Sequence, residues 1–398
     1  MNLPTELQPD QRKWDVIVVG LGAVGSATAY QLSRRHAKVL GLDRFHPPHN
    51  RGSSHGETRI TRLALGEGEH YVPFVRRSHE IWRELEAATG RSLLRSVGGL
   101  IYGSSSSRTV AHGADDFLQT TIDVAKRQGI THEVLDAAKL RERFPQFHLR
   151  GDETGYYEPE AGYVLPEACI ATQLEQAQSA GAAIRTGEQV LNWQTDREGV
   201  CVTTDRSRYE ADRLILCAGP WLPELVKPLA PRVKVFRQTL FWFQPDGPPE
   251  LFSPDRMPIF IRVPDAQTQM VYGFPMINGF EGGLKVAGEQ FDRAISPEDA
   301  GDEVHETEKS AMHALASPHV RISPRCVRST VCKYTVTPDF GFVIDQHPDS
   351  DRVWFASACS GHGFKHSPAV GEALAEITLG GSSRLDLSRF RLAQPNKG

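Results

Sequence analysis

Apolar and polar positions at the start of the chain define a strand, a helix and a second strand. The run from Val16 to Val19 is apolar and β-branched throughout, which is typical of a strand buried on both faces. A helical pattern follows from Ser26 to Arg35, and a second short apolar run extends from Lys38 to Leu42. This order predicts a βαβ unit, in which the helix connects two parallel strands.

The glycine pattern G-x-G-x-x-G stands between the first strand and the helix. Gly20 allows a sharp turn, Gly22 allows the backbone to approach a pyrophosphate, and Gly25 allows the helix to pack closely on the strand. The helix N-terminus also offers unpaired N–H groups to phosphates. Asp43 ends the second strand, where a carboxylate accepts a hydrogen bond from a ribose hydroxyl. We therefore predict a dinucleotide site that includes the neighbouring Arg44; a glycine-rich turn in another kind of βαβ unit is the alternative.

Further along the chain, the pattern changes and then returns to alternating strands and helices. A long amphipathic helix is expected from about Tyr71 to Ala88. Residues 232 to 290 alternate apolar and polar positions and are rich in aromatic residues, which predicts antiparallel strands. Strands that run into glycine turns are expected again at Arg213–Trp221 and Arg352–Lys365, the second leading into a helix from Pro368 to Leu379.

The nucleotide-binding part is therefore assembled from the beginning, middle and end of the chain. In nicotinamide dehydrogenases this fold is normally one continuous block, whereas an interrupted layout suits a flavoprotein. We expect an α/β fold with a discontinuous Rossmann-like FAD-binding domain formed by residues 13–92, 152–228 and 326–398. An inserted α+β substrate domain, formed by residues 93–151 and 229–325, is expected to hold a mixed, largely antiparallel sheet.

Composition narrows the class of protein. The chain has 398 residues, of which 39% are hydrophobic and 24% charged, so it can bury a substantial core. Its net charge of −4 favours neither nucleic acid nor membranes as partners, and no apolar run reaches the roughly 20 residues of a membrane span. The six cysteines are scattered without a C-x-x-C pair, so we expect neither disulfides nor a metal site. The first 14 residues are polar and are interpreted as a tail, and we expect a cytoplasmic protein.

Basic residues occur in two stretches that combine charge with glycine. The stretch from His55 to Arg62 contains Arg59 and Arg62, which lie on one side of a helix or turn. A guanidinium binds both oxygens of a carboxylate, although a solvated basic edge is the alternative. The later stretch contains Gly361, Gly363 and Lys365. Its glycines permit close approach to a flat ring beside a positive charge, and a plain turn from strand to helix is the alternative there.

These stretches belong to five blocks that resemble one family of flavoenzymes. The chain is similar to the group of monomeric sarcosine oxidase, N-methyltryptophan oxidase and pipecolate oxidase, from Asp15 to about Arg391. The blocks, in order, are Phe45–His49, His55–Arg62, Gly66–Pro73, Cys332–Asp339 and Ser360–Lys365.

The resemblance implies the reaction. It indicates FAD-dependent oxidation of the C–N bond of a secondary amino acid, either N-methyl or cyclic. The products would be an imine, or what the imine gives on hydrolysis, and hydrogen peroxide. The implied partners are a small amino acid and dioxygen, with the protein a monomer. The alternatives are a dehydrogenase of the same fold that uses another electron acceptor, and a non-catalytic protein that binds flavin or NAD.

The resemblance also implies roles for single residues. It places Cys332 where the family attaches FAD through a thioether, although a single buried cysteine is usually only a small hydrophobe. Arg62 and Lys365 would hold the substrate carboxylate, and Lys285 would activate dioxygen. Residues expected near the flavin or in the substrate pocket are Arg59, His55 and Tyr334.

Glu289 departs from the pattern of this family. Sarcosine oxidases have a histidine near the substrate amine at this position, and a carboxylate cannot act as a neutral imidazole would. It could pair with a substrate ammonium or with another positive group of a different substrate. We therefore expect a larger or cyclic secondary amino acid rather than sarcosine, unless Glu289 points to solvent.

Overall fold

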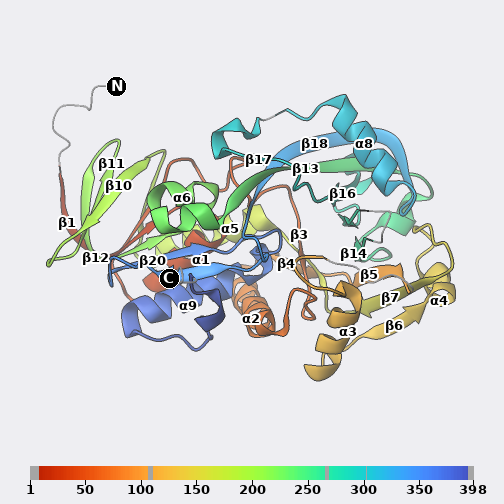
Figure 1. Ribbon diagram of the computed structural model, residues 1–398, viewed down its shortest axis with the longest axis horizontal. Coiled ribbons are helices and arrows are strands. Elements are labelled where there is room, and N and C mark those ends of the chain that lie inside the picture. The colour runs from red at the N-terminus through yellow and green to blue at the C-terminus, as the bar shows by residue number, and fades with distance from the viewer. Residues whose placement is uncertain (1–8, 106–110, 265–268, 302, 393–398) are drawn as a thin grey trace, which may run out of the picture.

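Two large sheets lie next to each other along the long axis of the computed structural model (Figure 1). The structure describes residues 9–105, 111–264, 269–301 and 303–392. A third, three-stranded sheet runs in the order β3 (Arg59–Thr61), β8 (Gly162–Val164) and β4 (Leu94–Ser96).

The first large sheet has eight strands that come from the beginning, middle and end of the chain. Six follow the order β10-β11-β12-β1-β2-β9, while β20 pairs with β12 and β19 pairs with β20. The strands are β1 (Pro9–Val19), β2 (Val39–Asp43), β9 (Ala183–Thr186), β10 (Val190–Thr195), β11 (Val200–Thr204), β12 (Arg208–Leu216), β19 (Val343–Gln346) and β20 (Val353–Ser357). The predicted βαβ unit is confirmed, because β1 and β2 are parallel. The predicted tail is wrong for residues 9–14, which belong to β1 and pair with β12.

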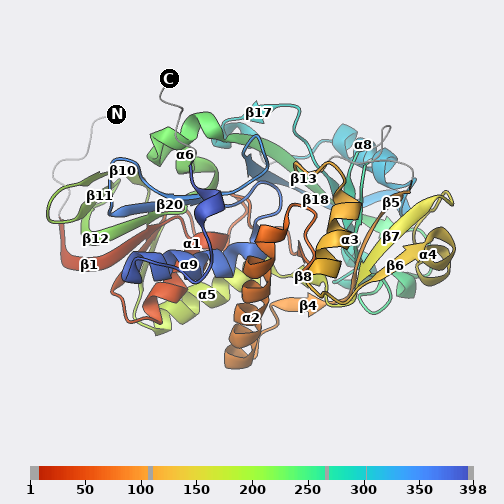
Figure 2. The same cartoon turned by 60° about the horizontal axis from the view of Figure 1, so that its bottom comes forward.

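Both faces of this sheet are covered, which explains the continuous apolar run of β1. Val16 and Val18 belong to a core formed with α1 (Ala23–Ser33), α5 (Pro166–Ser179) and α9 (Ser367–Gly380). These helices lie side by side in Figure 2, and α2 (Val72–Thr89) contacts α9 and confirms the predicted long helix. Ile17 and Val19 point to the opposite face, where they pack with residues around α6 (Leu222–Leu225).

The second large sheet has nine strands and is mixed but largely antiparallel, as expected. Eight follow the order β17-β13-β16-β15-β14-β5-β7-β6, and β18 pairs with β13. Only the β5–β14 pairing is parallel. The strands are β5 (Gly99–Ser104), β6 (Glu133–Asp136), β7 (Glu153–Glu158), β13 (Lys234–Pro245), β14 (Ile259–Arg262), β15 (Val271–Gly273), β16 (Leu284–Gly288), β17 (Ala294–Ile295) and β18 (Ile322–Val336). The remaining helices are α3 (Phe117–Arg127), α4 (Ala137–Arg143), α7 (Gly279–Gly282) and α8 (Glu306–Ala316).

Strand membership does not follow the predicted domain boundaries at every point. β7 and residues 326–336 of β18 lie in segments that the sequence assigns to the FAD-binding domain, yet both strands pair within the nine-stranded sheet. The boundaries themselves therefore stay a prediction. β18 is 15 residues long, and its last residues run toward the eight-stranded sheet, so this strand contributes to the region where the two sheets meet (Figure 1).

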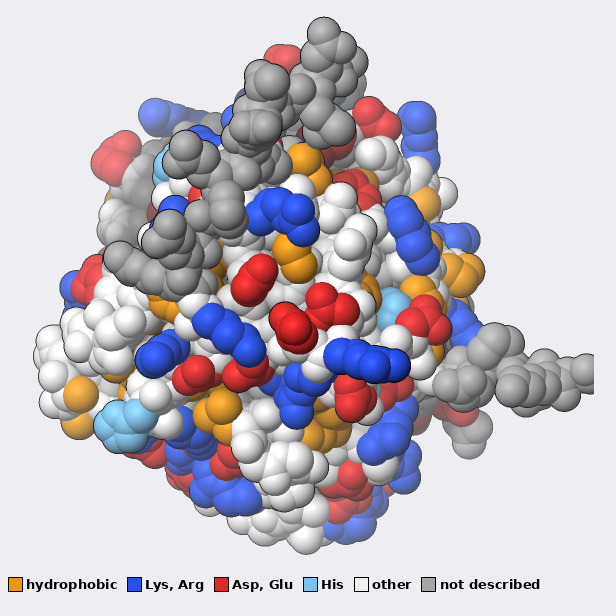
Figure 3. Space-filling view, turned by 90° about the vertical axis from the view of Figure 1, so that its left-hand side faces the viewer, with side chains coloured by type: hydrophobic (Ala, Val, Ile, Leu, Met, Phe, Trp, Pro, Cys, Tyr) orange, Lys and Arg blue, Asp and Glu red, His pale blue; other side chains and the backbone are white. Residues whose placement is uncertain are grey.

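The surface at the β10–β11 end of the molecule has a mixed charge. Basic and acidic side chains are interspersed over this face, with single hydrophobic side chains between them (Figure 3). Among the described helices, none combines the length and the apolar character that crossing a membrane requires.

Candidate active site

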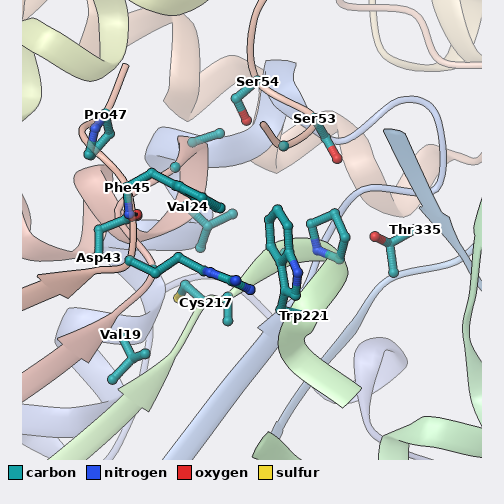
Figure 4. Close-up of a pocket in the computed structure, with 18 of the residues that line it drawn as sticks. Val19, Val24, Asp43, Phe45, Pro47, Ser53, Ser54, Cys217, Trp221 and Thr335 are labelled. Atoms are coloured by element: carbon teal, nitrogen blue, oxygen red, sulfur yellow. Dashed lines mark hydrogen bonds between the residues drawn. The ribbon is translucent and has the colours of Figure 1, made fainter. Parts of the chain in front are cut away.

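A first cavity opens at the carboxyl ends of β1, β2 and β12, beside the start of α1. It encloses about 1160 Å³, part of it open to solvent, and its walls include Gly20, Gly22, Asp43 and Arg44. Figure 4 shows side chains from distant segments around the same space, among them Asp43, Trp221 and Thr335. The carboxyl ends of parallel strands are where open α/β sheets bind ligands.

The glycines act at this cavity in different ways. Gly20 has a φ of 83°, and a Cβ there would lie 2.5 Å from the carbonyl oxygen of Cys217. A Cβ on Gly25 would lie 1.7 Å from the oxygen of Gly20, so Gly25 permits packing rather than lining the cavity. Gly22 is the N-cap of α1 and has no side chain to cap the first turn. The first N–H groups of this helix are thus available to a phosphate.

Asp43 and Thr335 supply polar atoms that fit a dinucleotide. Asp43 is buried, and its two carboxylate oxygens accept hydrogen bonds from the backbone N–H groups of Leu21 (2.7 Å) and Phe45 (2.8 Å). Each oxygen keeps a further lone pair, which can accept a ribose hydroxyl. The buried Thr335 hydroxyl has no hydrogen-bond partner in the described protein, and buried polar groups normally have one. The residues present therefore fit FAD at this site.

A second cavity adjoins the first and brings most of the predicted substrate-site residues together. The two cavities share wall residues that include Ala23, Ser54 and Cys359. The second encloses about 870 Å³, again partly open to solvent. The predicted residues in its wall are Arg59, Arg62, Lys285, Glu289, Tyr334, Gly361, Gly363 and Lys365.

The two predicted carboxylate-binding cations already contact a carboxylate of the protein. An Nη2 atom of Arg62 lies 2.7 Å from Glu67, and Nζ of Lys365 lies 3.3 Å from the other oxygen of Glu67. Burial opposes ionisation of Glu67, but Arg62 and Lys365 outweigh it and hold its pKa well below the ordinary value. Burial lowers the pKa of Lys365 to about 8, although Glu67 opposes this shift. Arg62 and Lys365 therefore surround one carboxylate, that of Glu67.

Lys285 and Arg59 form a second pair of basic side chains, and both line the second cavity. Lys285 is buried and donates to the carbonyl oxygens of Gly56 (2.6 Å) and Thr58 (2.8 Å). Both acceptors are neutral, so burial and the nearby Arg59 lower the pKa of Lys285 well below its ordinary value. Arg59 donates to Cys332 Sγ at 3.5 Å.

Cys332 and His55 are buried next to this pair but do not line either cavity. All six cysteines of the chain are free thiols. The His55 Nε2 atom has no partner among the described residues. Burial, and then the charge of Arg59, lowers the pKa of His55 to about 3, so its imidazole is neutral at ordinary pH.

Tyr334, Gly361 and Gly363 also line the second cavity. The hydroxyl of Tyr334 lies 3.0 Å from that of Tyr272, and burial raises the pKa of Tyr334 well above its ordinary value. A Cβ on Gly361 would lie 3.3 Å from both Glu289 and Tyr334, so it would crowd these side chains, and the φ of 78° at this position also favours glycine. A Cβ on Gly363 would lie 1.8 Å from the oxygen of Ala358.

Glu289 faces the cavity rather than solvent, and its partner was not predicted. Its Oε1 atom lies 2.5 Å from Nε2 of His112, which comes from the segment between β5 and α3. Glu67 and Tyr272 are further cavity residues that were not predicted. Glu67 could have been noticed, because it is an acidic residue close in sequence to Arg62. His112 carries no local signal, since its contacts come from residues far along the chain.

Comparison with known proteins agrees with the fold. The family model described as FAD dependent oxidoreductase matches residues 15–377. The chain belongs to this family. The monomeric sarcosine oxidase of Streptomyces avermitilis is 40% identical over 379 residues, which are 95% of this chain and 96% of that protein. The N-methyl-L-tryptophan oxidase of Yersinia pestis is 34% identical over 386 residues, covering 96% and 99%.

A solved structure gives a similar result for the fold. NikD, described as an unusual amino acid oxidase essential for nikkomycin biosynthesis, superposes with a TM-score of 0.83 at 26% identity. The match covers 96% of this chain and 98% of that one. The α/β fold with mixed sheets is therefore that of an FAD-dependent oxidoreductase.

Proposed function

We propose that this protein is an FAD-dependent oxidase of secondary amino acids, either N-methyl or cyclic. The observation that carries the proposal is the meeting of Arg62, Lys365 and Lys285 in one cavity beside the dinucleotide cavity. The relatives named for sarcosine and for N-methyl-L-tryptophan support it, because both compounds are N-methyl amino acids.

The residues of the second cavity suit this reaction. Oxidation removes two electrons and two protons from the CH–NH unit and leaves an imine. Dioxygen gains two electrons and two protons to become hydrogen peroxide. Bound FAD supplies the two-electron acceptor between these halves. Arg62 and Lys365 bind and orient the substrate carboxylate. Arg59 and Lys285 favour the negative charge that dioxygen gains on reduction.

The test is an anaerobic titration of the purified flavoprotein with a panel of N-methyl and cyclic amino acids. We expect loss of the oxidised flavin absorbance with at least one of them, followed by recovery and peroxide on admission of air. Reduction without peroxide would identify a dehydrogenase that uses another acceptor. No reduction by any member of the panel would refute the proposal.

We also propose that FAD is attached covalently to Cys332. This cysteine is buried beside Arg59, and it lies three residues before Thr335, whose unpartnered hydroxyl lines the first cavity. Denatured protein should keep its flavin fluorescence on a gel, and Cys332→Ala should lose it. Cys359→Ala is the matched control, because Cys359 lines both cavities and should leave the attachment intact. Release of all flavin from wild-type protein on acid precipitation would contradict the covalent link but not FAD binding.

We further propose that the protein acts as a monomer in the cytoplasm. The name of the Streptomyces relative supports the first part, and the six free cysteines are consistent with a reducing compartment. Sedimentation velocity of the purified flavoprotein tests the oligomeric state, and a dimer would contradict it. Fractionation of cells tests the location.

A further inference from the structure

A tight turn carries His112 into the wall of the second cavity. The backbone of Ala111 and Ala114 is joined by two hydrogen bonds, of 3.1 and 3.0 Å. The two residues between them are left-handed, with φ of 48° at His112 and 76° at Gly113, as in a two-residue type I′ turn. This conformation disfavours a residue other than glycine, so the surroundings of His112 must hold it in place.

These surroundings include three rings and two carboxylates. Phe117 lies edge-on to the imidazole at a centroid distance of 6.0 Å. The imidazole stacks on Phe340 and on His362, each with a centroid distance of 5.6 Å. Its Nε2 atom lies 2.5 Å from Glu289 Oε1, and its Nδ1 atom lies 3.7 Å from Glu67 Oε1. Burial disfavours the charged imidazole, but Glu289 and Glu67 outweigh burial and raise the pKa of His112 to about 9.

The two carboxylates differ in their other partners. Glu67 has Arg62 and Lys365, whereas His112 is the one side chain in the described part of the chain that forms an ion pair with Glu289. Glu289 also lines an outer groove next to α8, so it lies in the wall between the cavity and that groove. Without His112, the carboxylate of Glu289 would face the cavity without its ion-pair partner.

We propose that His112 determines substrate specificity by forming an ion pair with Glu289, which keeps this carboxylate from binding a positive group of the substrate. In this arrangement the cavity accepts secondary amino acids with an uncharged side chain and rejects those with a second ammonium group near Glu289. The inference rests on the proposed function, because it names the substrate class of the same site. It reverses the expectation from sequence that Glu289 receives a positive group of the substrate, since a positive group of the protein is already there. Specificity would then arise from repulsion by His112 as much as from attraction.

The test compares ligands that differ only by a terminal ammonium group. Hexanoate and 6-aminohexanoate, and likewise butyrate and 4-aminobutyrate, share the carboxylate that Arg62 and Lys365 would bind. Each is titrated into the flavin-loaded protein at pH 7, with the change in flavin absorbance giving the dissociation constant. For the wild type we expect the amino compound of each pair to bind at least tenfold more weakly than the plain acid.

In His112→Gly we expect the ratio of the two dissociation constants within each pair to fall at least tenfold, because Glu289 becomes free to bind the ammonium group. Glycine accepts the left-handed φ, so this variant should fold. In the double variant His112→Gly/Glu289→Gln, the improved binding of the amino compounds relative to the plain acids should be lost. His36→Gly is the matched control, because His36 is exposed and also left-handed, with a φ of 64°.

Three results would overturn the inference. The first is a ratio of dissociation constants within each pair that stays within twofold of the wild-type ratio in His112→Gly. The second is a reduced ratio that persists in the double variant. The third is wild-type protein that binds none of the four acids. The four acids need not be oxidised, so the result can be read even if no secondary amino acid reduces the flavin. If the proposed function holds, Nα-methyllysine should become a better substrate relative to Nα-methylnorleucine in His112→Gly.

Discussion

Arg62→Ala should weaken both the binding of carboxylates and the folded state, and these two effects can be separated. Arg62 and Glu67 form a buried pair at 2.7 Å, with side chains 2% and 3% exposed. Removing the arginine takes away one of the two cations predicted to bind the substrate carboxylate. It also leaves Glu67 buried with a weaker set of partners, namely Lys365 at 3.3 Å and His112 at 3.7 Å.

The two magnitudes follow from these contacts. Breaking a buried pair by removing one partner costs about 3–5 kcal/mol of folding free energy. Because Lys365 remains near Glu67, we expect the lower end, about 3 kcal/mol. Loss of one partner of a charge-assisted contact costs about 2–5 kcal/mol in binding. At about 1.4 kcal/mol for each tenfold change, the dissociation constant should rise by a factor of about 30 to more than 1,000.

The assay pairs two variants. Arg62→Ala/Glu67→Gln removes the buried anion together with its cation, so stability should largely recover while carboxylate binding should not. Urea unfolding measures the first quantity, and titration of the flavin absorbance with hexanoate measures the second. Wild-type affinity in a fully flavin-loaded double variant would remove Arg62 from the binding site. A fall in unfolding free energy below about 0.5 kcal/mol in Arg62→Ala would refute the argument from the buried pair.

Three further predictions concern other parts of the two cavities. Lys285→Met keeps the length of the side chain and removes its nitrogen. Reoxidation of the reduced flavin by dioxygen should therefore slow by orders of magnitude, while anaerobic reduction of the flavin changes little. Stopped-flow measurements test this, and equal slowing of both reactions would make Lys285 structural. Because the pKa of Lys365 is lowered to about 8, its ammonium is present below that pH and lost above it, so carboxylate affinity should fall as pH rises from 7 to 9. In Lys365→Arg this fall should be much smaller, since arginine stays charged, and an unchanged pH profile would exclude Lys365 as its source. Gly20→Ala places a Cβ 2.5 Å from the Cys217 oxygen at a φ of 83°, so purified protein should contain much less flavin than wild type, and full flavin content would contradict the close approach.

Local patterns were enough to predict the dinucleotide-binding part of the fold. The apolar run of β1 and the glycines after it depend on neighbours close in sequence, and their spacing follows from the geometry of one strand and one helix. Arg59 and Arg62 were found for the same reason, because they are only three residues apart in sequence. The helix or turn expected there is wrong, since Arg59 begins the strand β3 and Arg62 directly follows it. The mixed, largely antiparallel second sheet could be expected from alternation alone, although its pairing order could not.

The contacts that complete the candidate site had no such local signal. Glu289 and His112 are 177 positions apart, and Lys365 and Glu67 are 298 apart. The hydrophobic pattern of the sequence cannot predict contacts across such separations, because these contacts form only when the two sheets and the loops between them pack together. The sequence indicated Arg59, Arg62, Lys285 and Lys365, which the structure places around one cavity. It did not indicate Glu67, which pairs with Arg62 and Lys365. Nor did it indicate His112, which pairs with Glu289.

The scattered origin of the first cavity has a consequence for protein synthesis. Its walls come from residues near 20, near 220 and near 358, so a growing chain cannot complete the cavity until its last segments have left the ribosome. The parallel pairing of β1 with β12 and of β12 with β20 likewise joins segments that are made far apart in time. Such long-range pairing slows folding. Capture of the cofactor is therefore a late event, because the first cavity is complete only after the segment around residue 358 has been made and folded.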